Sequence, residues 1–221
     1  MTVRKAEESI YLQVMHTVVQ RLMIAEDALN RVEHNTVEPL EIGFFETAVL
    51  QLRLICELLL MGAASAHLHE GEQAINATKW RPKDVFGQIA KLNEHPLPFP
   101  VAVEIERNGQ GHHHVKPLSR PLPYEILSKI YGICGDLLHA PTISQVIGGR
   151  MAKLDCRVIK GWLGGFKSFV MSHALMLPER KIVLLCIWSG AFDAAPIAVK
   201  LEALGPSTFD MDALPGFDLI T

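Results

Sequence analysis

The sequence has no excess of basic charge and none of the common motifs for nucleotide binding or hydrolysis. The net charge is −3 over 221 residues, so no global positive field attracts nucleic acid, and any RNA or DNA contact would be local. The GxGxxG, GxSxG and GxxxxGK[ST] patterns are all missing. GGFKS at 164–168 lacks both the spacing and the preceding strand of a P-loop.

The sequence also lacks a cysteine pattern for metal or disulfide. Its four cysteines are widely spaced, without a CxxC pair, and each lies in an apolar segment: Cys56, Cys134, Cys156 and Cys186. This arrangement predicts buried free thiols in a reducing compartment, with no zinc site. No metal and no cofactor are expected.

Targeting and membrane signals are missing as well. The first residues, MTVRKAEESIYLQ, contain no apolar core of the signal-peptide type. The longest apolar run, around 54–66, is too short and too charged for a membrane span. With 49% hydrophobic and 20% charged residues, the sequence predicts a soluble cytoplasmic protein without membrane contact, large enough to bury its own core.

Apolar periodicity predicts a mainly α fold, a helical bundle of about five helices with a small antiparallel β element near the C-terminus (α+β). Two apolar runs, PERKIVLLCIWSG and APIAVKLEAL, are joined by Ser189 to Ala194 and predict a β-hairpin. The hairpin must pack on the helices or pair with a strand at 101–106, because two strands alone are marginal. The predicted helices cover residues 5–33, 40–68, 82–93, 123–139 and 145–170.

The expected organisation has three parts. Residues 1–175 form the helical bundle domain, which carries a Pro-rich insertion around 94–123. A turn at Arg107-Asn108-Gly109 predicts a small surface hairpin within this insertion. Residues 176–205 form the C-terminal β-hairpin packed on the bundle, and residues 206–221 form a tail.

The first predicted helix has a narrow apolar seam. Its members recur at alternating spacings of four and three: Tyr11, Met15, Val18, Leu22, Ala25, Leu29 and Val32. Such a stripe suits packing against one or two helices. Because it is also self-complementary, it favours a homodimer; a protein partner or RNA is a further candidate.

The second predicted helix contains two charges within an apolar run. Arg53 and Glu57 are four residues apart in LQLRLICELLLMGAASAH and therefore share a helix face. The pair could form a solvated stripe, a buried ion pair, or part of an interhelical cleft that handles a ligand or substrate. Removing one partner of a buried pair would cost about 3–5 kcal/mol.

The fourth predicted helix ends in a second polar group. Asp136 and His139 are three residues apart in CGDLLHA, and Tyr131 lies roughly on the same side. A carboxylate beside an imidazole can orient it as a general base. Alternatively, His139 caps the C-terminus of the helix and interacts with its dipole.

The segments FFETAVLQLRLICELLLMGA and YEILSKIYGICGDLLHA belong to a pattern of two long antiparallel helices and then a later helix that ends in a polar residue and a histidine. This pattern resembles the HEPN (higher eukaryotes and prokaryotes nucleotide-binding) helical superfamily. The resemblance implies a dimer, and many members of that superfamily are ribonucleases with a composite site. Their signature is Arg, four to six residues, then His. His139 has no arginine at that distance upstream, because positions 132–134 are Gly-Ile-Cys. Arg53 could substitute only if the second and fourth helices lie side by side.

The histidine clusters and the basic 150–167 segment each have a structural and a functional interpretation. His112, His113 and His114 are consecutive, so their side chains point in different directions and suit an exposed loop better than a metal site. His67 and His69 lie where a helix ends, where capping or solvation explains them. The 150–167 segment is the most basic, which is typical of a solvated helix face but also allows phosphate contact.

The sequence therefore supports two hypotheses. One is a noncatalytic HEPN-like protein that acts through self-association or partner binding. The other is a dimeric ribonuclease or nucleotide-processing enzyme, with catalytic candidates Arg53, Glu57, Asp136 and His139 around one cleft. In the enzyme, the arginine would bind phosphate and the histidine would act as acid and base.

Overall fold

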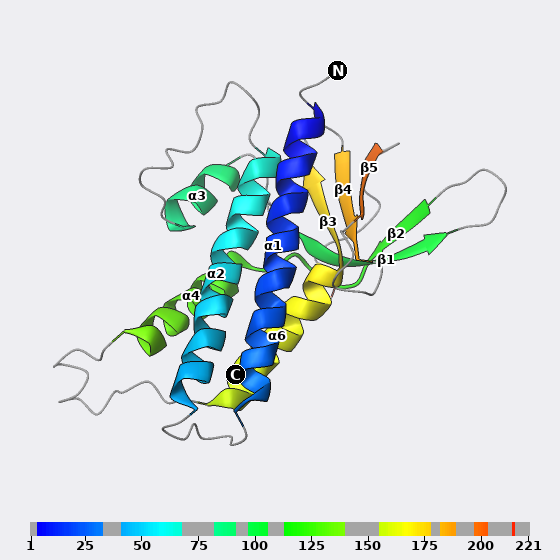
Figure 1. Cartoon of the computed structure of the whole chain (residues 1–221). Helices are drawn as coiled ribbons and strands as arrows, with labels where there is room; N and C mark the ends of the chain where they lie inside the picture. Colours follow the sequence, from blue (N-terminus) through cyan, green and yellow to red (C-terminus); the bar gives the residue numbers. More distant parts are fainter. Residues whose placement is uncertain are drawn as a thin grey trace.

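The computed structural model describes residues 4–32, 41–67, 82–91, 97–105, 113–139, 155–177, 182–188 and 197–202, together with Leu214. Within them the chain is mainly helical with a small antiparallel sheet, as predicted (Figure 1). The helices are α1 (Arg4–Asn30), α2 (Ile42–His67), α3 (Pro82–Ile89), α4 (Tyr124–Leu138) and α6 (Cys156–Met171). The strands are β1 (Phe99–Ile105), β2 (His113–Pro117), β3 (Ser172–Leu177), β4 (Ile182–Ile187) and β5 (Ile197–Glu202).

Helices α1 and α2 lie side by side and run antiparallel (Figure 1). The hydrogen bond from Arg21 Nη1 to Gln51 Oε1 measures 3.0 Å, and the Arg31 guanidinium lies 5.5 Å from the centre of the Phe44 ring. At the other end, Gly62 allows close approach, because a Cβ there would lie 2.6 Å from Met15 Cε.

This packing buries the apolar seam of the first helix. All seven predicted seam residues are buried in the core, from Tyr11 to Val32, and none is more than 3% exposed. The seam therefore faces the rest of the chain and is unavailable as an outer surface for a second copy. Any interface with a second copy has to use other residues.

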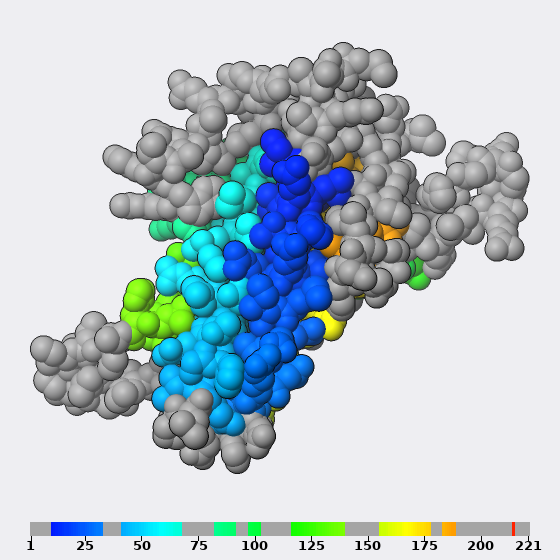
Figure 2. Space-filling model, in the orientation of Figure 1, coloured from blue at the N-terminus to red at the C-terminus, as the bar shows by residue number. Residues whose placement is uncertain are grey.

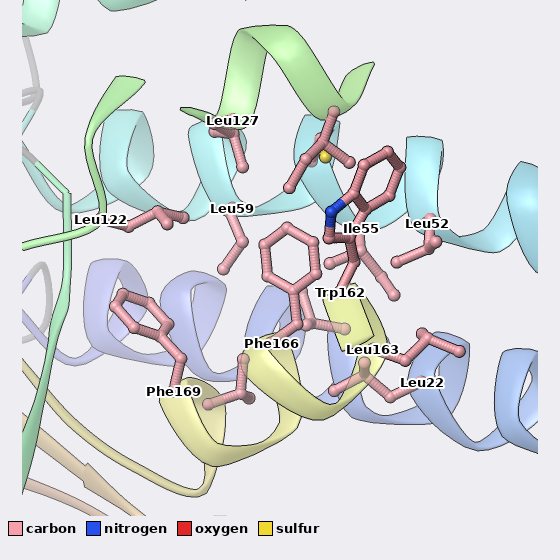
Figure 3. Packing of buried hydrophobic residues seen from close by; sticks show 14 of the residues in the cluster. Leu22, Leu52, Ile55, Leu59, Leu122, Leu127, Trp162, Leu163, Phe166 and Phe169 are labelled. Carbon is pink, nitrogen blue, oxygen red and sulfur yellow. The ribbon is translucent and has the colours of Figure 1, made fainter. Parts of the chain in front are cut away.

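Helix α6 packs against α1 and α2 and supplies much of the core. Its aromatic side chains Trp162, Phe166 and Phe169 lie among apolar side chains of α1, α2 and the α4 region (Figure 3). Asp155 caps the helix by accepting a hydrogen bond from the Arg157 backbone N–H at 2.9 Å. This cap places the start of α6 at Cys156, so the prediction of one helix from 145 is wrong.

The five strands form one antiparallel sheet in the order β2-β1-β3-β4-β5. The predicted terminal hairpin is β4–β5, with Cys186 opposite Ala198. The predicted strand at 101–106 is β1, and it pairs with β2 as an insertion hairpin; the Asn108-Gly109 turn lies outside the described residues. Strand β3 was missed by the sequence analysis, and it joins β1 to the terminal hairpin.

Both faces of the sheet bury apolar side chains. Leu175 of β3 and Leu184 of β4 belong to the helical core, whereas Ala174 and Leu185 belong to a second cluster with Phe99 and Val101. Alternate residues of each strand therefore face opposite sides. The division of the chain into bundle, hairpin and tail domains stays a prediction.

Candidate functional site

The candidate site lies where α2 packs on α4. Arg53 of α2 contacts Tyr131 and approaches Gly135 of α4. Leu60, further along α2, lines a hollow with Tyr124, near the start of α4. Because later residues of α2 meet earlier residues of α4, the two helices run antiparallel.

Arg53 is partly enclosed by α4 (Figure 1 shows α4 beside α2). Its Nη2 donates a hydrogen bond of 3.0 Å to the Tyr131 hydroxyl, and its guanidinium lies 4.6 Å from the centre of the Tyr131 ring. A Cβ at position 135 would lie 3.3 Å from Arg53 Nη1. Gly135 therefore leaves the space in which the guanidinium sits against α4.

The pair of Arg53 and Glu57 is half-buried. Arg53 Nε lies 3.9 Å from Glu57 Oε1, and each side chain is 26% exposed. This geometry lies between the predicted alternatives of a solvated stripe and a buried ion pair. A contact of this length with this exposure contributes little stability, so both groups keep capacity for further partners.

Asp136 and His139 do not join this pair. Both are exposed, and among the described residues no hydrogen bond or ion pair connects them to each other or to Arg53 and Glu57. His139 is the C-cap of α4, and its backbone N–H donates to Gly135 O at 3.1 Å. The structure brings Arg53 against α4, but among the described residues the four candidates do not form one connected cluster.

A small hollow of about 20 Å³, with room for about one water molecule, lies among residues of α2, α3 and α4 and includes Tyr131, the partner of Arg53. Its lining is mostly apolar and consists of Cys56, Leu60, Pro82, Tyr124, Leu127, Ser128 and Tyr131. Burial raises the pKa of the Cys56 thiol well above its usual value and that of Cys134 to about 12. Neither thiol is therefore suited to act as a nucleophile here.

Two residues of the predicted basic helix form ion pairs within the described part of the chain. Lys167 binds Glu26 of α1 at 2.7 Å, and Arg157 binds Asp155 at 3.0 Å. His67 is buried and donates from Nδ1 to Ala63 O at 2.8 Å, as expected for a histidine bonding a carbonyl of the last turn. No group of three His, Cys, Asp or Glu residues that could bind a metal occurs among the described residues; His69 and His112 lie outside them.

The sequence did not predict a buried polar pair between α1 and β3. The Tyr11 hydroxyl and His173 Nε2 are 2.7 Å apart, and His173 Nδ1 lies 2.9 Å from Val170 O. Because the carbonyl can only accept, Nδ1 carries the proton and Nε2 accepts from the tyrosine. Burial lowers the pKa of His173 to about 4, so the ring is neutral near pH 7.

Comparison with known proteins gives no relative. No family model, no curated protein and no solved structure matches the chain. Within the described residues, α2 alone is long and apolar enough to cross a membrane, but 61% of its most apolar 18-residue window is buried in the structure. That burial is typical of the core helix of a folded domain.

Proposed function

We propose that this chain is a noncatalytic, HEPN-like helical protein that acts through association, chiefly with a second copy of itself. The observation that carries the proposal is an open row of residues on α2, the outer stripe: Leu50, Arg53, Leu54, Glu57 and Met61. Leu50 is 44% and Met61 42% exposed, and Leu54 is half-buried. Exposed apolar residues that share one face are typical of interaction surfaces, unlike isolated ones.

The surroundings of the stripe extend this surface. Val14 and Arg21 of α1 contact Gly62 and Gln51 of α2. Ile10 lies one turn before Val14, and Ile24 about one turn after Arg21, so both occupy the same flank of α1. Ile10 is 49% and Ile24 44% exposed. In Figure 2, α1 and α2 together form the face toward the viewer.

The catalytic candidates support association better than chemistry. Arg53 is bonded to Tyr131 and lies near Glu57, whereas Asp136 and His139 form no hydrogen bond or ion pair with either of them among the described residues. A catalytic base is commonly oriented by a second group, and among the described residues the exposed His139 has no side-chain partner of this kind. No arginine stands at the signature spacing before His139, which agrees with a site on α4 that has no nuclease activity.

Charged substitutions in the stripe should abolish association. Leu50→Glu or Met61→Glu would place a carboxylate in the desolvated contact, and we expect a shift from dimer to monomer in light scattering coupled to size exclusion. Leu118→Glu is the matched control, because Leu118 is 52% exposed but lies between β2 and α4. A wild-type chain that is strictly monomeric at high concentration would contradict the proposal.

The alternative, a ribonuclease or nucleotide-processing enzyme, is favoured by one observation. Arg53 is partly exposed between α2 and α4, and its close neighbour on α4 is Gly135. His139 follows Gly135 by about one helical turn. A substrate phosphate could thus meet the guanidinium and the imidazole together where α2 packs on α4. In that reading the arginine binds phosphate and the histidine transfers protons.

The rate of RNA cleavage distinguishes the two functions. If the chain is a ribonuclease, His139→Ala should lower the cleavage rate at least about 100-fold. The thermal midpoint should stay unchanged, since the side chain is exposed. Asp136→Asn is the control for a general charge effect. Cleavage by purified wild-type chain that survives in His139→Ala would point to a contaminating nuclease and reject the enzyme.

A further inference from the structure

We infer that two copies of this chain pair through antiparallel α2 helices, with Arg53 of each copy bound to Glu57 of the other. The inference rests on the proposed self-association and names its geometry. It starts from the chemistry of the outer stripe, which reads apolar, cationic, apolar, anionic, apolar from Leu50 to Met61. A two-fold interface requires a surface that is complementary to itself, and this order meets that requirement.

The register follows from helix geometry. A two-fold axis crossing α2 between Ile55 and Cys56 places Leu50 opposite Met61 of the second copy, since both are equally distant from the axis. The same axis brings Arg53 within one residue, or about 1.5 Å of rise, of Glu57 of the second copy. This offset is small compared with the reach of the two side chains.

The positions of the charged and apolar residues around α2 also fit this two-fold pairing. Arg53 and Glu57 lie on the flank of α2 that faces α4, where Arg53 contacts Tyr131. Leu54 is turned about 100° from Arg53, toward α1. A two-fold rotation keeps each flank on its own side, so the two ion pairs form along one flank and Leu54 meets its own copy along the other.

The polar atoms of the stripe have unused capacity for these contacts. Within the described residues, Glu57 accepts no hydrogen bond, and its nearest cation is Arg53 at 3.9 Å. Arg53 uses Nη2 for Tyr131, which leaves other N–H donors of the guanidinium available. An intermolecular pair, partly desolvated by the flanking apolar residues, would be shorter and stronger than the intramolecular one.

The stripe is about 16 Å long, which is short for a stable interface. The flank of α1 supplies the remainder, through the exposed Ile10 and Ile24. A membrane surface is a poorer occupant, because the stripe carries one positive and one negative group and interfacial helices are rich in Lys and Arg.

Charge exchange tests the pairing. Arg53→Glu and Glu57→Arg each create two like-charge contacts in the homodimer, so each should weaken self-association at least about tenfold in analytical ultracentrifugation. An equimolar mixture of the two variants should recover near wild-type affinity, because both contacts become attractive in the mixed dimer. Glu125→Arg and Lys129→Glu are matched controls, four residues apart on the exposed face of α4, and should have no effect.

A crosslink provides a second test that leaves Arg53 intact. Leu54→Cys should form a disulfide-linked dimer with oxidised glutathione, while Leu118→Cys should not; the native cysteines are all buried. If the wild type is a dimer, but the charge-exchange variants keep its affinity and Leu54→Cys forms no crosslink, this pairing is wrong and self-association stands. A strictly monomeric wild type, or a monomer that binds neutral vesicles through the stripe, would overturn both.

Discussion

Acidification from pH 6.5 to 4 should remove about 3 kcal/mol of folding stability through His173 alone. In the unfolded chain this imidazole protonates near pH 6.5. In the folded chain, burial lowers its pKa to about 4. The unfolded state therefore binds the proton first, and stability is full above pH 6.5 and falls as the pH drops toward 4. The size follows from about 1.4 kcal/mol per pH unit.

The geometry explains why the folded chain resists this proton. His173 lies between Tyr11 of α1 and the strands next to β3, opposite Cys186 and Pro100 in register. None of these neighbours carries a negative charge near pH 7; burial raises the pKa of Tyr11 well above its usual value and that of Cys186 to about 12. An imidazolium would thus be desolvated without a counter-charge.

Urea unfolding of the wild type and two variants between pH 7 and 4 measures the effect. His173→Gln should unfold more easily at pH 7, but its stability should fall much less toward pH 4. His139→Gln should keep the wild-type pH dependence, because that side chain is exposed at the end of α4. Parallel curves for the wild type and His173→Gln would show that another group causes the loss.

The helical core was predictable because its apolar periodicity is long and regular. The sequence placed α1, α2 and α4 within about three residues of the observed ends. Strand β3 was missed because SHALML continues directly from α6 and contains good helix formers. Pairing with β4 and β1 overrides that local preference, and such long-range pairing is invisible in one short segment.

The candidate site was predictable only within each helix. The spacing of Arg53 and Glu57 gave their shared face, but the contact of Arg53 with Tyr131 depends on how α2 packs against α4. Gly135 carried a signal that could have been used: a glycine one turn after Tyr131, inside a helix, indicates close approach by another group. The buried seam of α1 shows the converse, since a self-complementary stripe looks the same whether its partner is another copy or the same chain.

Phe166→Ala should destabilise the fold by about 3–5 kcal/mol, the range for removing a fully buried phenylalanine. Phe166 has 0% exposure and lies at the centre of the cluster in Figure 3, among residues of α2 and neighbouring elements. Its ring fills space between packed helices, and the surrounding structure closes such a cavity only partially. Chemical denaturation at an unchanged m-value measures the loss.

Phe44→Ala is the matched control. Phe44 is 40% exposed and its ring lies beneath Arg31, so its removal should cost about 1 kcal/mol or less. A large difference between the two variants requires α6 to be inserted into the bundle as described. Equal losses would mean that α6 packs elsewhere, and the packing that sets α2 against α4, with Arg53 between them, would lose its support.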